Sequence, residues 1–145
     1  MSLMNIYPVT QNDFGKVIAL LKENNLPTDD ISETTVLFSL YDNNELTGTI
    51  GLEHYGENGL IRSLCVKEGK RNDGSGNVLV NFIEDYAQRQ HITTLYLLTT
   101  TAADYFTKRG YQTISRNEAP EAIQQTSAFK EVCPSNATIM KKSFA

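Results

Sequence analysis

The spacing of hydrophobic residues changes midway along the chain, and this change constrains the fold more than any other feature. Alternating apolar residues and short polar turns predict three strands, at Val36–Tyr41, Leu46–Tyr55 and Leu60–Val66. Apolar residues then recur at helical spacing over Gly76–Arg89, and Thr94–Thr99 follows as a buried strand. Strands followed by a helix and a further buried strand are typical of a mixed α/β domain with a central sheet.

The remaining segments complete this pattern. Thr10 is a candidate N-cap for a helix over residues 11–24, with Asp13 as a weaker capping-box partner, and a late helix over Ala102–Arg109 should end at Gly110. Further strands are expected at Asn5–Val9, Tyr111–Ser115 and Ala137–Met140, with a turn of helix near Pro120–Gln125. The predicted fold class is α/β (α+β), a mixed sheet of about six or seven strands flanked by about four helices.

Length and composition fit one domain. At about 150 residues per domain, the 145-residue chain forms a single domain, residues 1–145, with its core at about 4–142. No run approaches the roughly 18 apolar residues of a membrane span. The N-terminus lacks the pattern of a signal peptide, and a second Met at position 4 fits Met1–Leu3 as a cloning remnant. We therefore expect a cytoplasmic protein with no membrane partner.

Charge and cysteine usage argue against several other classes of function. Thirteen basic and 17 acidic residues give a net charge of −4, which disfavours nucleic-acid binding. Cys65 and Cys133 lie far apart in sequence, so we expect packed thiols in a reducing compartment rather than a disulfide framework. His54 and His91 share no metal-ligand spacing with each other or with a cysteine, so no metal site is predicted.

The loop between the strand Leu60–Val66 and the next helix has the composition of an anion-binding site. It contains Arg71-x-x-Gly74-x-Gly76, with Lys70 beside the arginine. Glycines let backbone N–H groups turn toward one point, and the N-terminus of the following helix adds partial positive charge. Together with the basic side chains, these groups suit a pyrophosphate. On these residues alone, a flexible loop with an ordinary helix cap explains the pattern equally well.

In its wider context this loop resembles the central motif of the GNAT acetyltransferase superfamily. The resemblance covers Asn5 to about Lys142 and rests on Leu64-x-Val66, Arg71-x-x-Gly74-x-Gly76 and the late helix closing on Gly110-Tyr111. Two features resemble the amino-acid N-acetyltransferase branch and the arsenic-resistance N-acetyltransferases. They are Leu97–Thr101 followed by Tyr105–Tyr111, similar to the acetyl-transfer domain of acetylglutamate synthase, and Gly51-Leu52-Glu53 with Leu60–Leu64 and the tail Phe129–Ala137.

The resemblance implies acetyl-CoA as co-substrate and a small-molecule amine as acceptor. In such folds the strand Leu60–Val66 splays away from Thr94–Thr99, often at a bulge, and pantetheine enters between them. The implied cofactor-binding residues are Leu64, Cys65, Val66, Arg71, Asn72, Asp73, Gly74, Ser75, Gly76, Thr99 and Phe106. For Thr99 a purely structural role is an equal alternative. Many members look like dimers, so a homodimer is expected, although no feature selects an interface.

The chain departs from the superfamily at two positions that matter for chemistry. The usual Tyr four residues before the late glycine, which protonates the leaving thiolate, is Phe106 here. Tyr105 is the adjacent phenol and a catalytic candidate, although helical spacing points it elsewhere. The Glu that some members carry as base at the start of the central strand is Leu60, and the nearest carboxylates are Glu53 and Glu57.

Glu53 and Arg62 are the remaining catalytic candidates, and they stand on adjacent strands of a hairpin. Glu53 reads as a solvent-facing carboxylate, a general base or an anchor for a substrate ammonium. Arg62 lies at every-second-residue spacing with Leu60 and Leu64, so it shares a strand face that is otherwise apolar. It suits either a surface ion pair or bidentate binding of a substrate carboxylate. A third hypothesis is that Glu53 and Arg62 form an ion pair with each other.

The first functional hypothesis is therefore an acetyl-CoA-dependent N-acetyltransferase acting on a small amine, with an amino acid as one candidate. One alternative is a non-catalytic acyl-CoA-binding sensor or interaction module, which Phe106 and the absent strand Glu favour. Another is a protein or peptide N-acetyltransferase, which differs by needing an open groove. The sequence does not name the acceptor amine.

Overall fold

The computed structural model describes residues 4–26, 28, 31, 34–69, 74–126, 129–130 and 137–144. These residues form seven strands, four α-helices and one 3₁₀ turn. They are β1 (Met4–Pro8), α1 (Gln11–Glu23), β2 (Thr35–Asp42), β3 (Glu45–Tyr55), β4 (Asn58–Val66), α2 (Ser75–Arg89), β5 (Thr94–Thr99), α3 (Ala103–Lys108), β6 (Gln112–Ile114), the 3₁₀ turn η1 (Arg116–Glu118), α4 (Glu121–Gln124) and β7 (Thr138–Ser143). The strands are hydrogen-bonded in the order β1-β2-β3-β4-β5-β7-β6.

Backbone contacts divide the chain into two compact units. Unit 1 comprises Met1–Glu53 and Ile61–Tyr86, and unit 2 comprises His54–Leu60 and Ala87–Ala145. In unit 1, β2 and β3 form an antiparallel hairpin whose register runs from Thr35↔Glu53 to Asp42↔Glu45. The intervening Asn43 and Asn44 both have positive φ, as a type I′ hairpin turn requires.

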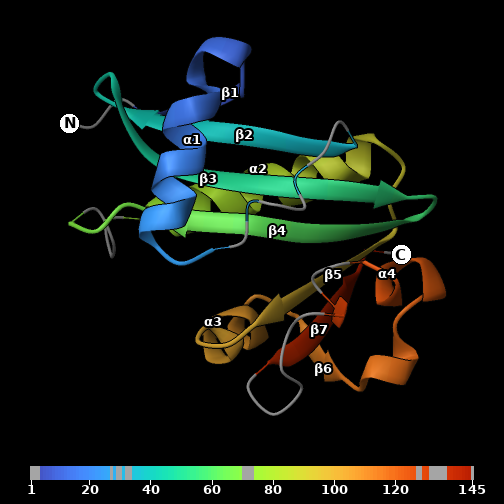
Figure 1. Cartoon of the computed structure of the whole chain (residues 1–145). Helices are drawn as coiled ribbons and strands as arrows, with labels where there is room; N and C mark the ends of the chain where they lie inside the picture. The colour runs from blue at the N-terminus through green and yellow to red at the C-terminus, as the bar shows by residue number, and fades with distance from the viewer. Residues whose placement is uncertain are drawn as a thin grey trace. The chain divides into compact units, whose positions relative to one another are not determined.

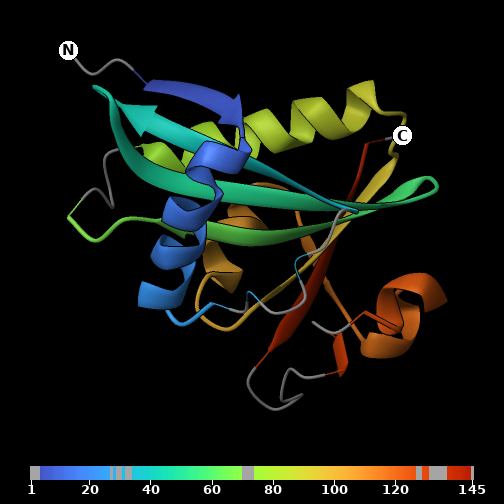
Figure 2. The same cartoon turned by 45° about the horizontal axis from the view of Figure 1, so that its top comes forward.

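The two long helices of unit 1 cover opposite faces of its strands (Figures 1 and 2). Leu37 shares a buried cluster with Val17, Leu20 and Leu21 of α1. The next residue, Phe38, makes edge-to-face contact with Phe82 and Tyr86 of α2, with ring centroids 4.7 and 5.0 Å apart. Successive side chains on a strand point to opposite faces, so β2 contributes to the core on both sides.

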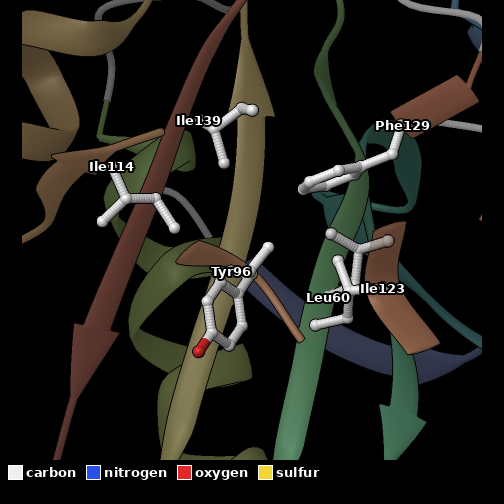
Figure 3. Close-up of a cluster of buried hydrophobic side chains, with 7 residues drawn as sticks. Leu60, Tyr96, Ile114, Ile123, Phe129 and Ile139 are labelled. Atoms are coloured by element: carbon white, nitrogen blue, oxygen red, sulfur yellow. The ribbon is translucent and has the colours of Figure 1, made fainter. Parts of the chain in front are cut away.

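Unit 2 is built on the parallel pairing of β4 with β5, which covers Asn58↔Thr94 to Leu60↔Tyr96. Strand β7 pairs antiparallel with both β5 and β6. The hydrophobic core of unit 2 contains seven buried residues, Leu60, Tyr96, Ile114, Ala119, Ile123, Phe129 and Ile139 (Figure 3). The parallel pairing of β4 and β5 follows from the order of elements. Parallel strands need a long crossover connection, and α2 provides it between these two strands.

The predicted elements are confirmed, with ends displaced by a few residues at most. Gly110 has φ +97° after α3, the left-handed residue expected beyond a helix end. Thr10 caps α1 but makes no side-chain bond to the helix backbone; its hydroxyl instead donates to the Asp13 carboxylate at 3.3 Å. Within the described ranges, none of the helices has the length and hydropathy needed to cross a bilayer.

Candidate functional site

Glu53 and Arg62 form a buried ion pair in unit 1. Arg62 Nη1 donates to Glu53 Oε2 at 2.7 Å, and the side chains of Arg62 and Glu53 are 8% and 10% exposed, respectively. The Thr35 hydroxyl also donates to Glu53 Oε2, at 3.4 Å, and Arg62 Nε donates to Ser63 Oγ at 3.2 Å. The prediction that Glu53 and Arg62 pair with each other is therefore confirmed, and the solvent-facing reading of Glu53 is wrong.

A break in the regular geometry of β4 follows directly after Arg62. Ser63 has φ +56°, a left-handed conformation inside a strand, and its carbonyl accepts a 2.8 Å bond from the buried Thr49 hydroxyl. Arg62 lies on the α1 side, because a Cβ at Gly51 would meet Leu37 Cδ2 and Arg62 Cγ there. Cys65, three residues later, belongs to the same α1-side cluster.

This side-chain placement corrects the expected alternation of β4. In a regular strand, residues three apart point to opposite faces, so Arg62 and Cys65 could not share one. The left-handed Ser63 shifts the pattern by one residue. Arg62 therefore shares its face with Cys65 and not, as strict alternation predicted, with Leu64. The positive φ of Ser63 marks this irregularity, while a bulge at which β4 splays from β5 stays an expectation of the family resemblance.

The predicted phosphate loop is described from Gly74 onward, at the N-terminus of α2. Gly74 has φ +92°, and its carbonyl accepts the helical bond from Val78 N at 3.0 Å, so it occupies the N-cap position. The first turn contains no acidic residue. A Cβ placed at Gly74 or Gly76 would meet no atom within 4 Å, so both glycines border open space. Lys70, Arg71, Asn72 and Asp73 lie outside the described residues.

The other cofactor-binding candidates of unit 1 differ in exposure. Leu64 and Val66 are partly buried, whereas Cys65 is 6% exposed and packs beside α1. The expectation of a packed Cys65 thiol is confirmed. Ser75, the first residue of α2, is 1% exposed. Cys133 lies outside the described residues.

In unit 2, Thr99 shapes the turn before α3. Its hydroxyl accepts hydrogen bonds from the backbone N–H of Ala102 at 2.9 Å and of Thr101 at 3.4 Å. These bonds fix the chain as it leaves β5. The structural role considered for Thr99 is therefore observed, while contact with a cofactor stays a prediction.

Phe106 and Tyr105 differ in their surroundings on α3. Phe106 is 4% exposed, with Tyr105 and Tyr111 packed edge-to-face at centroid distances of 5.1 and 5.3 Å. Tyr105 is half-buried, and the Arg109 guanidinium lies over its ring at 5.9 Å. The Phe106 ring thus belongs to an aromatic cluster, and its neighbour projects toward a cation at the end of the helix.

No group of three or more potential metal-ligating side chains occurs in the described part of the chain. Two residues that hold the buried pair, Thr35 and Ser63, were not foreseen. The register of β2 against β3 would have revealed Thr35. Position 63 is a serine, not a glycine or asparagine, so the residue type gives no signal of a left-handed conformation inside the strand.

The sequence matches the model of one known protein family. Residues 33–113 match the model of the acetyltransferase (GNAT) domain. The chain belongs to the GNAT acetyltransferase family, as its resemblance predicted.

Among proteins of known function, similar sequences are amino-acid acetyltransferases. The one from Pseudomonas syringae pv. tomato is 36% identical over 87 residues, covering 60% of this chain and 19% of that protein. The one from Neisseria meningitidis is 36% identical over 93 residues, covering 63% and 21%, respectively. The chain thus spans about a fifth of the length of these relatives. The likeness to arsenic-resistance N-acetyltransferases stays a prediction.

Solved structures share the fold. N-acetylglutamate synthase from Neisseria gonorrhoeae, complexed with coenzyme A and N-acetyl-glutamate, superposes with a TM-score of 0.83 at 24% identity, covering 99% of this chain and 35% of that one. The ribosomal-protein-S18-alanine N-acetyltransferase from Escherichia coli has a TM-score of 0.76 at 14% identity, covering 99% and 95%. The predicted mixed α/β class is therefore confirmed.

Proposed function

We propose that this chain binds acetyl-CoA and transfers its acetyl group to the amine of a small molecule, with an amino acid as the first candidate. The observation that carries the proposal is the Gly74-capped N-terminus of α2, which follows β4 and its left-handed Ser63. Membership of the GNAT family and similarity to amino-acid acetyltransferases support it. When bound, acetyl-CoA supplies the thioester carbonyl that the amine attacks.

The residues at the start of α2 fit a diphosphate. A helix N-terminus carries a partial positive charge and unpaired N–H donors, and α2 is 15 residues long. The open space beside Gly74 and Gly76 allows a bulky anion to approach the backbone. We assign the diphosphate to the amides of residues 71–76, with the Arg71 side chain adding full charge. The Cys65 and Val66 amides are assigned to pantetheine and the thioester oxygen.

The buried pair supports an acceptor that carries a carboxylate. Glu53 and Ser63 fix the plane of the Arg62 guanidinium before any substrate arrives. A planar guanidinium in a fixed orientation is suited to bidentate recognition of a carboxylate. We assign Arg62 to that carboxylate and Glu53 to orienting Arg62 and to the substrate ammonium.

A panel of amines tests the proposal directly. The protein is incubated with acetyl-CoA and amino acids, polyamines and short peptides, and products are identified by mass spectrometry. We expect N-acetylation of at least one carboxylate-bearing small amine. Acetylation of peptides alone would point instead to a protein N-acetyltransferase. Saturable acetyl-CoA binding without any product would contradict the proposal.

That last outcome would favour a second candidate, a non-catalytic acyl-CoA-binding module. The observation in its favour is Phe106, a buried ring without a hydroxyl at the position where the family usually has its phenol. We retain the transferase reading, because a CoA thiolate leaves readily near neutral pH and water can protonate it. A single cytoplasmic domain that forms a homodimer stays an expectation of the family resemblance.

Exchanging the phenol between two adjacent positions tests the role of α3. We expect Tyr105→Phe to change kcat less than about twofold, because the Tyr105 ring projects toward Arg109. Phe106→Tyr should raise kcat by about 100-fold, the lower end of the usual range for a general acid. Steady-state kinetics over a range of pH provide the measurement. A large loss of kcat in Tyr105→Phe would instead identify Tyr105 as the acid.

A further inference from the structure

A cavity of about 400 Å³ opens in unit 1 beside the start of α1, where β1 pairs with the end of β2. Its volume is within the range of small-molecule sites. The lining residues are Asn5, Tyr7, Asp13, Tyr41, Asn43 and Asn44. All six carry polar atoms, and none carries a positive charge, so the cavity is polar and acidic.

Two aromatic rings contribute to the wall. Tyr7 and Tyr41 meet edge-to-face, with centroids 6.0 Å apart and an interplanar angle of 63°. Tyr7 is 50% exposed and, with Phe14, is one of the two exposed large hydrophobic side chains among the described residues. The faces of such rings carry negative potential and attract organic cations.

Asp13 supplies a full negative charge to the same cavity. Its carboxylate accepts hydrogen bonds from the Thr10 and Tyr41 hydroxyls. Burial, together with this bond to Asp13, raises the pKa of Tyr41, so the phenol stays protonated as a donor. Neither the Arg62–Glu53 ion pair nor the Lys67–Glu45 ion pair includes Asp13.

The cavity is separate from the buried pair assigned to the acceptor. It lies at the Asp42↔Glu45 end of the β2–β3 hairpin, whereas Glu53 pairs with Thr35 at the other end. Glu53 lies eight positions after Glu45 along β3, a distance of roughly 25 Å at about 3.3 Å per residue. A ligand in the cavity would therefore be an additional molecule and not the acetyl acceptor at Arg62.

We propose that this cavity is a second binding site, which takes an organic cation with a small alkylammonium head group. The ammonium pairs with the Asp13 carboxylate, its alkyl groups contact the rings of Tyr7 and Tyr41, and the Asn43 and Asn44 side-chain amides border the head group. Aromatic walls combined with one carboxylate are the arrangement that recognises such cations elsewhere.

Choline and n-butylammonium are the probes, and 3,3-dimethylbutanol is the neutral isostere of choline. Titrations of the full chain are followed by calorimetry and by the ring resonances of tyrosine in NMR spectra. We expect saturable binding of at least one cation, with shifts at Tyr7 and Tyr41, and at least tenfold weaker binding of the neutral alcohol. Absence of saturable binding for both cations, or equal binding of the alcohol, would overturn the proposal.

Variants separate the site from a general effect of charge. Asp13→Asn should weaken cation binding at least tenfold. Asp104→Asn, in the exposed first turn of α3, changes net charge by the same amount and should leave binding unchanged. Circular dichroism confirms folding of each variant. Equal loss in Asp13→Asn and Asp104→Asn would also overturn the proposal.

Discussion

Arg62→Met is expected to lower the free energy of unfolding by about 3 kcal/mol, because it leaves the Glu53 carboxylate buried without its cation. Both side chains are at most 10% exposed, so water replaces the lost partner only in small part. For a chain of this length, a loss of this size lowers Tm by roughly 10 °C. Thermal unfolding followed by circular dichroism measures the change.

The chain offers a matched control on its surface. Lys67 and Glu45 are also 2.7 Å apart, but their side chains are 45% and 47% exposed. Water screens such a pair, so Lys67→Met should leave Tm nearly unchanged. The double variant Glu53→Gln/Arg62→Met removes both buried charges and should recover most of the lost stability. Equal Tm values for Arg62→Met and Lys67→Met would contradict the assigned role of burial.

The second large effect concerns cofactor affinity. Arg71→Ala combined with Gly74→Val should weaken acetyl-CoA binding by about 100-fold, measured by calorimetry. Loss of a charge-assisted contact to phosphate accounts for about 1.5–3 kcal/mol, which is at least tenfold in affinity. Valine at φ +92° is strongly disfavoured, so the N–H groups that follow Gly74 would turn away from the ligand.

Gly56 provides the control for backbone strain. It has φ +64° in the turn between β3 and β4, and a Cβ there would meet no atom within 4 Å. Gly56→Val therefore introduces the same kind of strain outside the proposed phosphate loop. We expect it to lower Tm without changing acetyl-CoA affinity. A similar loss of affinity in Gly56→Val would mean that general destabilisation, not the loop, weakens binding.

The order and type of the elements could be predicted because each depends on local spacing. The period change near residue 67 separates the strand hairpins from α2, and Gly110 marks the end of α3 through its backbone freedom. The phosphate loop was predictable for the same reason, since glycine, arginine and a helix start are adjacent in sequence.

From the sequence, Glu53 and Arg62 could each be assigned only a set of alternative roles, one of which was pairing with each other. Whether a strand carboxylate faces water depends on which helix covers that face, and α1 packs there through contacts distant in sequence. The shift of β4 at Ser63 depends on the Thr49 hydroxyl of the neighbouring strand. Such cross-strand bonds leave no mark on the local sequence, so the placement of Cys65 on the same face as Arg62 could not be foreseen.

The most direct test of diphosphate binding by this loop compares the affinity of the protein for acetyl-CoA and for S-acetylpantetheine. S-acetylpantetheine carries the same thioester but lacks the nucleotide and its phosphates. Both are titrated into the wild-type protein by calorimetry under identical salt conditions. If the amides of residues 71–76 hold the diphosphate, acetyl-CoA binds in a 1:1 complex and at least about 100-fold more tightly than the truncated thioester. Equal affinities for the two would contradict the assignment.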